Sequence, residues 1–586
     1  MKRPAWSVIA ALAISVYGAL LRLDAFTGKY GTLERPAWAR IATQDVAPLT
    51  RHLRPSHVQW GIIARPYVGG DPYSYLKFAR EMTSFYQAHV REPVFLLTTR
   101  LGLRALDDQD AGVSLASAVG SVVTIFATYL LGAAVVSPVG GLIAAALCAI
   151  EFDAITWAVD GWRDDTFTAF FVLTAWALVR FRERASFSRA VLLGVLGAAA
   201  CLTRLTALSF ILPALAWIAI ERRAEGRRRL EYSAMALALL AIIVAPYLVN
   251  CAIATGDPFL AVNTHTSYYR HAEGVPEQQP MSAASYVRGK FARKPLETLD
   301  VAAMGLFVSP FEKKWHPFDI WIRGLSTVLW WAAAAGLILW IFQPAGRLMI
   351  LILLTALVPF AFTWNLGGGG EWRFTMHVYS VYLVAAVGAG AAVARAIAHR
   401  PAWKDVRLQL AAAAALVAIA VAFYVSMPWL VKREAIAAAE DVNIETGQRD
   451  RVFFRQGWSV PHTDGAVTSR VSQSERTSVH FPLPQKRDYD VVLRLDPVAP
   501  ETQKRITVLL NRNLIGSVLL SWNPERVGSY RLKLPAGWVR AGGNEIELLP
   551  ETMAVAGAAG PRLGWLDPAE RVGLRFWYLR VLASAP

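Results

Sequence analysis

The chain has 586 residues, of which 55% are hydrophobic and 18% are charged, and its mean hydropathy is +0.35. These values exclude an ordinary soluble protein of this length and predict a polytopic membrane protein. The formal net charge of +16 does not indicate a nucleic-acid partner, because much of the arginine falls in short loops between apolar runs, as the positive-inside rule requires.

Apolar segments that are long enough to cross a bilayer, at the roughly 20 residues that a spanning helix needs, recur about eleven times. The fifth and sixth are short and are joined by Leu202, Thr203 and Arg204. The predicted fold class is a polytopic α-helical membrane protein, with a transmembrane domain over residues 1–430. The segments are 6–24, 112–132, 139–158, 165–181, 189–202, 204–220, 232–251, 323–342, 347–363, 374–396 and 408–428.

Short basic loops set the predicted orientation. With the N-terminus taken as cytoplasmic, the loops that follow even-numbered segments should be basic, and those at 180–184, 221–229 and 395–407 are rich in arginine. The large loops 25–111 and 252–322 are then external. An odd number of spans also places the C-terminal region outside the cytoplasm. The expected location is the cell (inner) membrane, with a periplasmic C-terminal domain.

The C-terminal region, residues 452–586, has a different hydrophobic pattern. Short alternating runs are separated by turn residues, which predicts antiparallel strands and a β-sandwich of jelly-roll type. Residues 431–451 are expected to form a linker with a short helix. The predicted strands cover 478–481, 489–495, 506–510, 516–520, 529–534, 544–549 and 572–581.

Asp71 opens an amphipathic segment in the first external loop. It precedes Pro72, and the pair suits the N-cap and first position of a helix. Behind it, Tyr75, Ala79 and Met82 recur at helical spacing, which predicts a helix in the membrane interface with a carboxylate at its leading end. This pattern is compatible both with Asp71 as a helix cap only and with Asp71 as a catalytic residue.

A second acidic cluster lies in the turn between the third and fourth segments. Asp160, Arg163, Asp164 and Asp165 fall within six residues. Asp164 and Asp165 stand at the start of a helix, where the helix dipole favours negative charge. Capping would explain one or both, but three acids and an arginine exceed that need. Carboxylates at membrane depth are costly and tend to be functional.

Cations at the external face form a third feature. Glu371, Arg373 and His377 follow four successive glycines, and a guanidinium at the external end of a span suits a membrane-anchored phosphate. A flexible loop with a snorkelling arginine is the alternative. Arg204 and Arg270 place further cations on the same side. The chain has no GxxxxGK[ST], HExxH, GxSxG or Rossmann motif, so the substrates are expected to come from the membrane.

The order of these motifs resembles the GT-C superfamily of polyprenyl-phosphate-sugar-dependent glycosyltransferases. The likeness is closer to its protein O-mannosyltransferase and lipid A aminoarabinose transferase branch, and it covers residues 1–430. Gly70-Asp71-Pro72-Tyr73 followed by Arg91-Glu92-Pro93 looks like that group's first-loop signature. The segments 202–207, 254–259 and 371–374 are also similar. The sandwich is similar to carbohydrate-binding-type domains appended to some members.

The resemblance implies an inverting transfer from a polyprenyl-phosphate sugar to an extracytoplasmic glycan, lipid or protein. It implies Asp71 as general base, Asp164 or Asp165 as acceptor-orienting or metal-binding groups, and Arg204 and Arg373 as ligands of the phosphate. The other signature and loop residues are expected to contact substrate: Tyr73, Glu92, Asp160, Arg163, Arg270, Glu371 and His377.

A divalent metal, Mg²⁺ or Mn²⁺, is left open by the resemblance. Oligosaccharyltransferase-like members use one, whereas the mannosyltransferase branch does not need one in catalysis. Asp71, Asp164 or Asp165 would be its ligands. The chain departs from the branch by having Pro72 where an acid often follows the first-loop aspartate.

Two alternatives from other classes are a flippase or transporter of lipid-linked sugars, and a non-catalytic polysaccharide-binding assembly protein. Transporters usually show repeated halves and polar residues at the membrane midplane. Here the acids gather at one external face, which favours an enzyme. The assembly protein predicts instead that Asp71 and Asp164 are dispensable.

Overall fold

The computed structural model divides into two compact units, which are described separately. The first contains Met1–Ala283, Gly305–Phe360 and Trp372–Ala413, and the second contains Ala284–Met304, Ala361–Glu371 and Ala414–Pro586. The residues that the structure describes are 5–60, 70–221, 226–272, 282–312, 316–362, 374–399, 403–437, 441–446, 450–454, 457–464, 467–521, 528–563 and 566–584.

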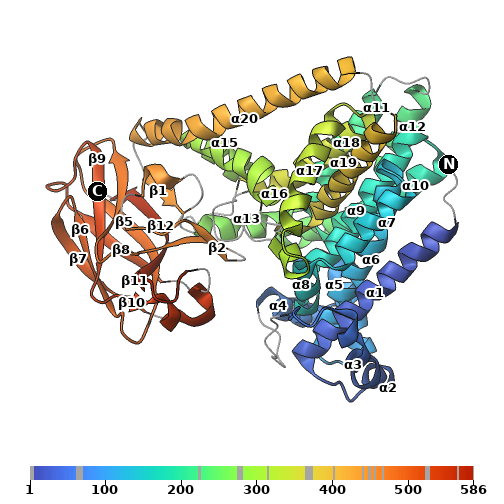
Figure 1. The fold of residues 1–586 in the computed structure, drawn as a ribbon, viewed down its shortest axis with the longest axis horizontal. Coiled ribbons are helices and arrows are strands. Elements are labelled where there is room, and N and C mark those ends of the chain that lie inside the picture. The colour runs from blue at the N-terminus through green and yellow to red at the C-terminus, as the bar shows by residue number, and fades with distance from the viewer. Residues whose placement is uncertain are drawn as a thin grey trace. The chain divides into compact units, whose positions relative to one another are not determined.

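Helices make up the first unit, and they run from blue through green to gold in Figure 1. They are α1 (Ala5–Tyr30), α2 (Ala37–Arg40), η1 (Ile41–Val46), α3 (Ala47–Thr50), η2 (Arg51–Leu53), α4 (Gly70–Glu81), α5 (Pro93–Ala105), α6 (Ala111–Val135), α7 (Pro138–Ala149), α8 (Phe152–Asp160), α9 (Arg163–Glu183), α10 (Phe187–Thr203), η3 (Leu205–Ala207), α11 (Leu208–Ile220), α12 (Gly226–Thr255), α13 (Leu260–Ala272), α16 (Ser309–Glu312), η5 (His316–Ile320), α17 (Leu325–Ile341), α18 (Pro344–Ala361), η7 (Met376–Val378), α19 (Tyr379–His399) and the start of α20 (Trp403–Ala437).

Each of the eleven apolar segments predicted from the sequence lies on one or two of these helices. Among the described residues, six helices are long and apolar enough to cross a membrane, namely α1, α6, α12, α18, α19 with η7, and part of α20. The bent pair α7 and α8, whose axes differ by 56°, raises this number to seven if it forms one span. Helices α10, α11 and α17 are apolar but shorter. The protein is therefore a multi-pass membrane protein.

Two glycines set the start of α9. Gly161, between α8 and α9, has a φ of +85°, a conformation that glycine adopts without the cost that a side chain would add. Gly120 on α6 allows a close helix approach, since a Cβ there would lie 2.8 Å from the backbone of Thr166. Small residues at such contacts let membrane helices pack closely. The first turn of α9 is thereby held against α6.

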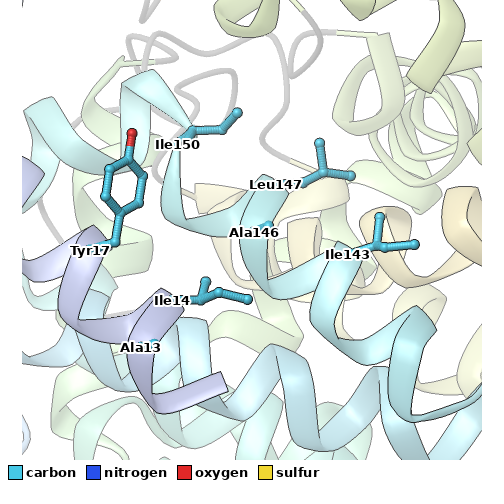
Figure 2. A pocket seen from close by; sticks show the side chains of 7 residues that line it. All are labelled: Ala13, Ile14, Tyr17, Ile143, Ala146, Leu147 and Ile150. Carbon is cyan, nitrogen blue, oxygen red and sulfur yellow. The ribbon is translucent and has the colours of Figure 1, made fainter. Parts of the chain in front are cut away.

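The loop that follows α1 folds back on that helix. Asp24 accepts hydrogen bonds from Arg54 Nε and Trp60 Nε1, both at 2.7 Å, and Tyr17 donates to the carbonyl of Leu53 at 2.9 Å. Beside Tyr17, α1 and α7 line an open apolar pocket of about 520 Å³ (Figure 2). It is lined by Ala13, Ile14, Tyr17, Ile143, Ala146, Leu147 and Ile150.

The second unit joins helices to a β-sandwich. Its helices are α14 (Ala283–Arg293), α15 (Pro295–Ala303), the beginning of η4 (Met304–Val308), and the rest of α20. The Glu434 carboxylate of α20 accepts hydrogen bonds from the backbone N–H groups of Leu296 and Glu297, at 2.8 and 2.7 Å. This carboxylate satisfies donors in the first turn of α15, which have no partner within the helix.

The sandwich has two main antiparallel sheets, in orange and red in Figure 1. One has the order β2-β3-β12-β5-β8, with β1 also on β12, and the other has the order β4-β9-β6-β7. The strands are β1 (Asp441–Glu445), β2 (His462–Asp464), β3 (Val467–Val471), β4 (Thr477–Leu483), β5 (Tyr489–Pro497), β6 (Arg505–Leu510), β7 (Asn513–Leu519), β8 (Ser529–Leu534), β9 (Gly542–Pro550), β10 (Ala554–Val555), β11 (Arg571–Val572) and β12 (Leu574–Ala583), with short helices η8 (Asp450–Val452) and η9 (Ala556–Leu563).

The strand order confirms the predicted jelly roll. The chain alternates between the sheets so that β3, β12, β5 and β8 face β4, β9, β6 and β7, as in two interleaved Greek keys. Inward residues of both sheets form one core, in which Val479 pairs with Ile546 and Leu493 with Leu579. Within 431–451, expected as a linker with a short helix, the structure has the end of α20, the strand β1 and the start of η8. Strand β1 pairs with β12 from Asp441 to Glu445.

Candidate functional site

A buried ion pair between Asp164 and Arg204 forms the centre of the candidate site. Arg204 Nη2 lies 2.8 Å from Asp164 Oδ1, and the two side chains are only 4% and 3% exposed. Asp164 is in the first turn of α9. Arg204 has extended backbone angles, φ −151° and ψ 117°, because it lies between the end of α10 and the start of η3. The break between these two helices therefore presents the guanidinium group to α9.

Three phenylalanine rings surround the Arg204 guanidinium. Its carbon atom lies 5.7 Å from the centre of the Phe167 ring, and 5.4 Å from those of Phe360 and Phe374. His377 packs against the same group, with its ring centre 5.2 Å from that of Phe167 and 5.8 Å from that of Phe360. The rings attract the cation and keep water away, which strengthens every electrostatic interaction that Arg204 makes.

A second buried ion pair lies beside the first. Arg163 Nη1 is 2.6 Å from Glu92 Oε2, and the side chains are 7% and 4% exposed. The other oxygen of Glu92 accepts a hydrogen bond from the backbone N–H of Leu205, at 2.9 Å. Glu92 immediately precedes α5, but its side chain does not cap that helix. Its carboxylate instead joins α9 to η3.

Asp71 is the accessible acid among the predicted catalytic residues. It lies in the first turn of α4, which begins at Gly70, and its side chain is 33% exposed, against 3% for Asp164. Its Oδ1 is 3.8 Å from Arg91 Nη2. The Arg91 guanidinium also lies over the Tyr75 ring, at 5.9 Å. A carboxylate that a substrate can reach can accept a proton from it.

Asp165 belongs to a different network from its neighbour Asp164. Its Oδ2 accepts a hydrogen bond from Ser117 of α6 at 2.7 Å, and the residue is 1% exposed. One turn further along α6, Ser121 accepts a hydrogen bond from Arg22 of α1, at 2.8 Å. Adjacent residues on a helix point in different directions. The two aspartates therefore have different partners, Ser117 for Asp165 and Arg204 for Asp164.

The other predicted site residues are distributed as follows. Asp160 forms an ion pair with Lys29 at 2.6 Å and is half exposed, away from Arg204. Tyr73 is 59% exposed on α4. His377 lies within the aromatic group around Arg204. Glu371, Arg373 and the side chain of Arg270 lie outside the described residues. The rings of Phe167, Phe360 and Phe374 were not predicted, because an apolar residue in a span carries no local sign of a cation above it.

The loop before Glu92 is held through His89. Its Nδ1 accepts the backbone N–H of Arg91 at 3.0 Å, and its carbonyl accepts a hydrogen bond from Tyr247 of α12 at 2.7 Å. The ring also packs edge-on against Phe78, at 4.3 Å. Burial lowers the pKa of His89 below its ordinary value. The neutral ring is therefore the form that supports this loop.

The acids of the site do not fit a metal centre. Asp71, Asp164 and Asp165 face Arg91, Arg204 and Ser117 respectively. No three His, Cys, Asp or Glu residues within the described ranges gather as metal ligands do. The apolar pocket of Figure 2 contains none of the predicted site residues either.

Comparison with known proteins gives one family and several solved structures. The sequence model of the family described as dolichyl-phosphate-mannose-protein mannosyltransferase matches residues 90–249. This stretch includes Glu92, Arg163, Asp164, Asp165 and Arg204. No curated protein matches.

The similar structures are distant. An archaeal oligosaccharyltransferase, AglB from Archaeoglobus fulgidus, in complex with an inhibitory peptide and a dolichol-phosphate, is 13% identical with a TM-score of 0.41; the match covers 69% of this chain and 54% of that one. A complex of an Archaeoglobus fulgidus oligosaccharyltransferase with Zn and sulfate is 15% identical, with a TM-score of 0.38, and covers 70% and 51%. ArnT from Cupriavidus metallidurans bound to undecaprenyl phosphate is 13% identical, with a TM-score of 0.38, and covers 71% and 64%.

The chain thus spans about half the length of the first two structures it matches, at 54% and 51%. The predicted resemblance to GT-C glycosyltransferases is confirmed by the family match, which covers the buried ion pairs but not Asp71. Residues 90–249 are similar to the dolichyl-phosphate-mannose-protein mannosyltransferase family, followed in the same chain by a C-terminal jelly roll.

Proposed function

We propose that this protein is an integral membrane glycosyltransferase that moves a sugar from a polyprenyl-phosphate donor to an extracytoplasmic glycan, lipid or protein. The observation that carries the proposal is the Arg204 guanidinium, buried among three aromatic rings and held by Asp164. A buried cation is costly to maintain even with an acidic partner, which among the described residues is Asp164. Its position in a membrane domain that lacks nucleotide motifs suits the phosphate of a lipid donor.

Arg204 would stabilise the leaving phosphate. Its Nε is buried and has no hydrogen-bond partner among the described residues, so the guanidinium has a donor to offer beyond the one that faces Asp164. A phosphate oxygen accepts such a donor more strongly in a site without water. As the bond between the anomeric carbon and the phosphate oxygen breaks, negative charge grows on the phosphate, and Arg204 offsets it.

Asp71 would act as general base. The acceptor hydroxyl attacks the anomeric carbon from the side opposite the phosphate, and its proton passes to the Asp71 carboxylate. The polyprenyl phosphate leaves with the electron pair of the broken bond, so the anomeric configuration inverts. Arg91, 3.8 Å from Asp71, would orient the carboxylate toward the acceptor. Asp164 would orient Arg204.

The test is transfer by the purified protein in liposomes, with a panel of radiolabelled polyprenyl-phosphate sugars and of glycan, lipid and peptide acceptors. We expect release of polyprenyl phosphate in step with product, and an inverted anomeric configuration when the product is examined by NMR. Retention of configuration would contradict the single displacement. Movement of the intact donor across the bilayer, without transfer to any acceptor, would identify the protein as a flippase instead.

A further inference from the structure

The side chain of Glu92 contacts the residue before Asp164 and the residue after Arg204, which are Arg163 and Leu205. One carboxylate oxygen is 2.6 Å from Arg163 Nη1, and Arg163 immediately precedes Asp164. The other accepts the N–H of Leu205 at 2.9 Å, and Leu205 immediately follows Arg204. A single carboxylate therefore binds the side chain of the residue before the acid and the backbone N–H of the residue after the cation.

The residue before Glu92 extends this link to Asp71. Arg91 Nη2 lies 3.8 Å from Asp71 Oδ1, and the Arg91 backbone N–H is itself fixed by His89 Nδ1 at 3.0 Å. The dipeptide Arg91–Glu92 thus contacts the accessible acid through the Arg91 side chain, and Arg163 and Leu205 through the Glu92 side chain. It links Asp71 to the two segments that carry Asp164 and Arg204.

Two simpler roles for Glu92 do not fit its surroundings. It precedes α5, yet its side chain makes no capping hydrogen bond to that helix. Its carboxylate is 4% exposed and both oxygens are occupied by protein groups, so a substrate would have to displace Arg163 or Leu205 to reach it. The Glu92 carboxylate therefore holds Arg163 and Leu205 in place.

We propose that Glu92 is a positioning residue that sets the geometry of the Asp164–Arg204 pair and does not contact substrate. The physical reason is competition for Asp164. Without Glu92, Arg163 becomes a buried cation that lacks its ion-pair partner, and Asp164 is an acid whose charge already acts on Arg163 and could replace it. Arg204 would then lose its partner to Arg163, and the peptide between Arg204 and Leu205 would lose its anchor. The catalytic part of this inference rests on the proposed function, whereas the structural part does not.

The structural part is tested by hydrogen–deuterium exchange on the full-length protein in nanodiscs. In Glu92→Ala we expect the amide of Leu205 to exchange at least about 10-fold faster, because its acceptor is gone. Glu92→Gln keeps an oxygen that can accept this N–H, so protection of Leu205 should be retained. The matched control is Glu81→Gln, an exposed acid at the end of α4 whose ion pair with Lys77 spans 4.0 Å. Unchanged exchange at Leu205 in Glu92→Ala would overturn the proposal, whether or not the protein transfers sugar.

The catalytic part is tested by kinetics with whichever polyprenyl-phosphate sugar the wild-type protein uses. Glu92→Gln should lower kcat roughly 10- to 100-fold and change the donor KM less than about 3-fold, because a misplaced group affects the transition state more than binding. Glu92→Asp, which keeps the charge but is one methylene shorter, should not rescue activity. A large rise in donor KM at unchanged kcat would show that Glu92 binds substrate, and would overturn the proposal.

A double variant tests whether Glu92 affects the transfer rate through Arg163 or independently of it. If Glu92 works by occupying Arg163, then Glu92→Gln combined with Arg163→Gln should be no slower than Arg163→Gln alone. If the fold-losses of the two single variants multiply in the double variant, the two residues act independently, and the proposed action of Glu92 through Arg163 is contradicted. A wild-type protein that transfers no sugar, with the exchange result as expected, would refute the proposed function while leaving the structural role of Glu92 intact.

Discussion

Arg204 Nη2 and Asp164 Oδ1 lie 2.8 Å apart in an ion pair from which water is almost excluded. The acid belongs to the first turn of one helix and the cation to the break between two others, so the pair closes a junction of three segments. Replacement of a buried ion pair by apolar residues is often neutral or stabilising, so its presence is weak evidence for a structural need. The effect of the pair on stability and its effect on sugar transfer can therefore be measured separately.

Arg204→Met removes the cation and leaves Asp164 as a buried carboxylate without its partner. We expect a loss of about 3–5 kcal/mol in the free energy of unfolding, because an uncompensated buried charge is strongly destabilising. Adding Asp164→Asn should recover most of that loss, since the remaining amide carries no charge. Thermal unfolding in detergent measures both effects. Sugar transfer should remain absent in the stable double variant, and recovery of transfer with stability would contradict the assignment of the phosphate to Arg204.

Arg204→Lys retains a positive charge but removes the planar group that lies among Phe167, Phe360 and Phe374. Ion pairing with Asp164 should preserve folding, so the unfolding temperature should stay close to that of the wild type. Donor binding should weaken about 10-fold or more, because the ammonium group lacks the flat face and the fork of donors of arginine. Binding of undecaprenyl phosphate to the purified protein measures this. Equal affinity in the two proteins would show that the aromatic group has no part in recognition.

Asp165→Asn should differ sharply from Asp164→Asn, although the residues are adjacent. Asp165 accepts a hydrogen bond from Ser117, and an asparagine oxygen can accept the same bond. Transfer by Asp165→Asn should remain within about 3-fold of wild type, whereas Asp164→Asn should lose roughly 100-fold, comparable with the removal of one stabilising group. Sugar-transfer rates of the two variants, measured in parallel with the wild type, test this difference. Similar losses in both variants would mean that the two aspartates act together.

Acid should weaken the loop at His89. Burial lowers the pKa of this histidine in the folded protein below the ordinary value of 6.5, so the unfolded state binds the proton more readily. The stabilising contribution of the neutral ring is therefore fully present above about pH 6.5 and is lost as the pH falls through that value toward the lowered pKa. Protonation would also remove the acceptor for Arg91 N–H. The charge of Arg91 lowers the pKa of His89 further, whereas the backbone hydrogen bond with Arg91 and the charge of Glu81 raise it.

His89→Asn provides the measurement for this effect. Its amide oxygen can accept the Arg91 N–H but does not titrate. Between about pH 7 and pH 5, we expect the unfolding temperature of the wild type to fall more than that of the variant. Comparison of the two proteins removes the contribution of other groups that titrate in acid. Parallel curves would show that His89 does not carry the pH dependence.

Much of the fold follows from local pattern. Each predicted apolar segment lies on a helix, because a run of apolar residues in a membrane has no other way to satisfy its backbone. The strands from β4 to β9 match the predicted runs closely, since alternation and turn residues are local signals. Strand β1 was not predicted, because its pairing with β12 joins residues that are more than 130 positions apart.

The site was predicted only in its residue types. The motifs indicate acids and cations on one side of the membrane, and the structure brings Glu92, Arg163, Asp164 and Arg204 together. The split between Asp164 and Asp165 follows from helix geometry, yet which one meets Arg204 depends on the packing of α6, α9 and α10. The ring of aromatic side chains comes from three distant segments, so nothing in the local sequence marks it.

The most direct test of the account is the sugar-transfer rate of Asp71→Asn in liposomes. Asparagine keeps the size of the side chain but cannot take a proton from the acceptor. The matched control is Glu81→Gln on the same helix. General-base catalysis contributes about 10²- to 10⁴-fold, so we predict a loss of that size in Asp71→Asn, with unchanged binding of undecaprenyl phosphate and full activity in the control. Transfer by Asp71→Asn at the wild-type rate would contradict the account.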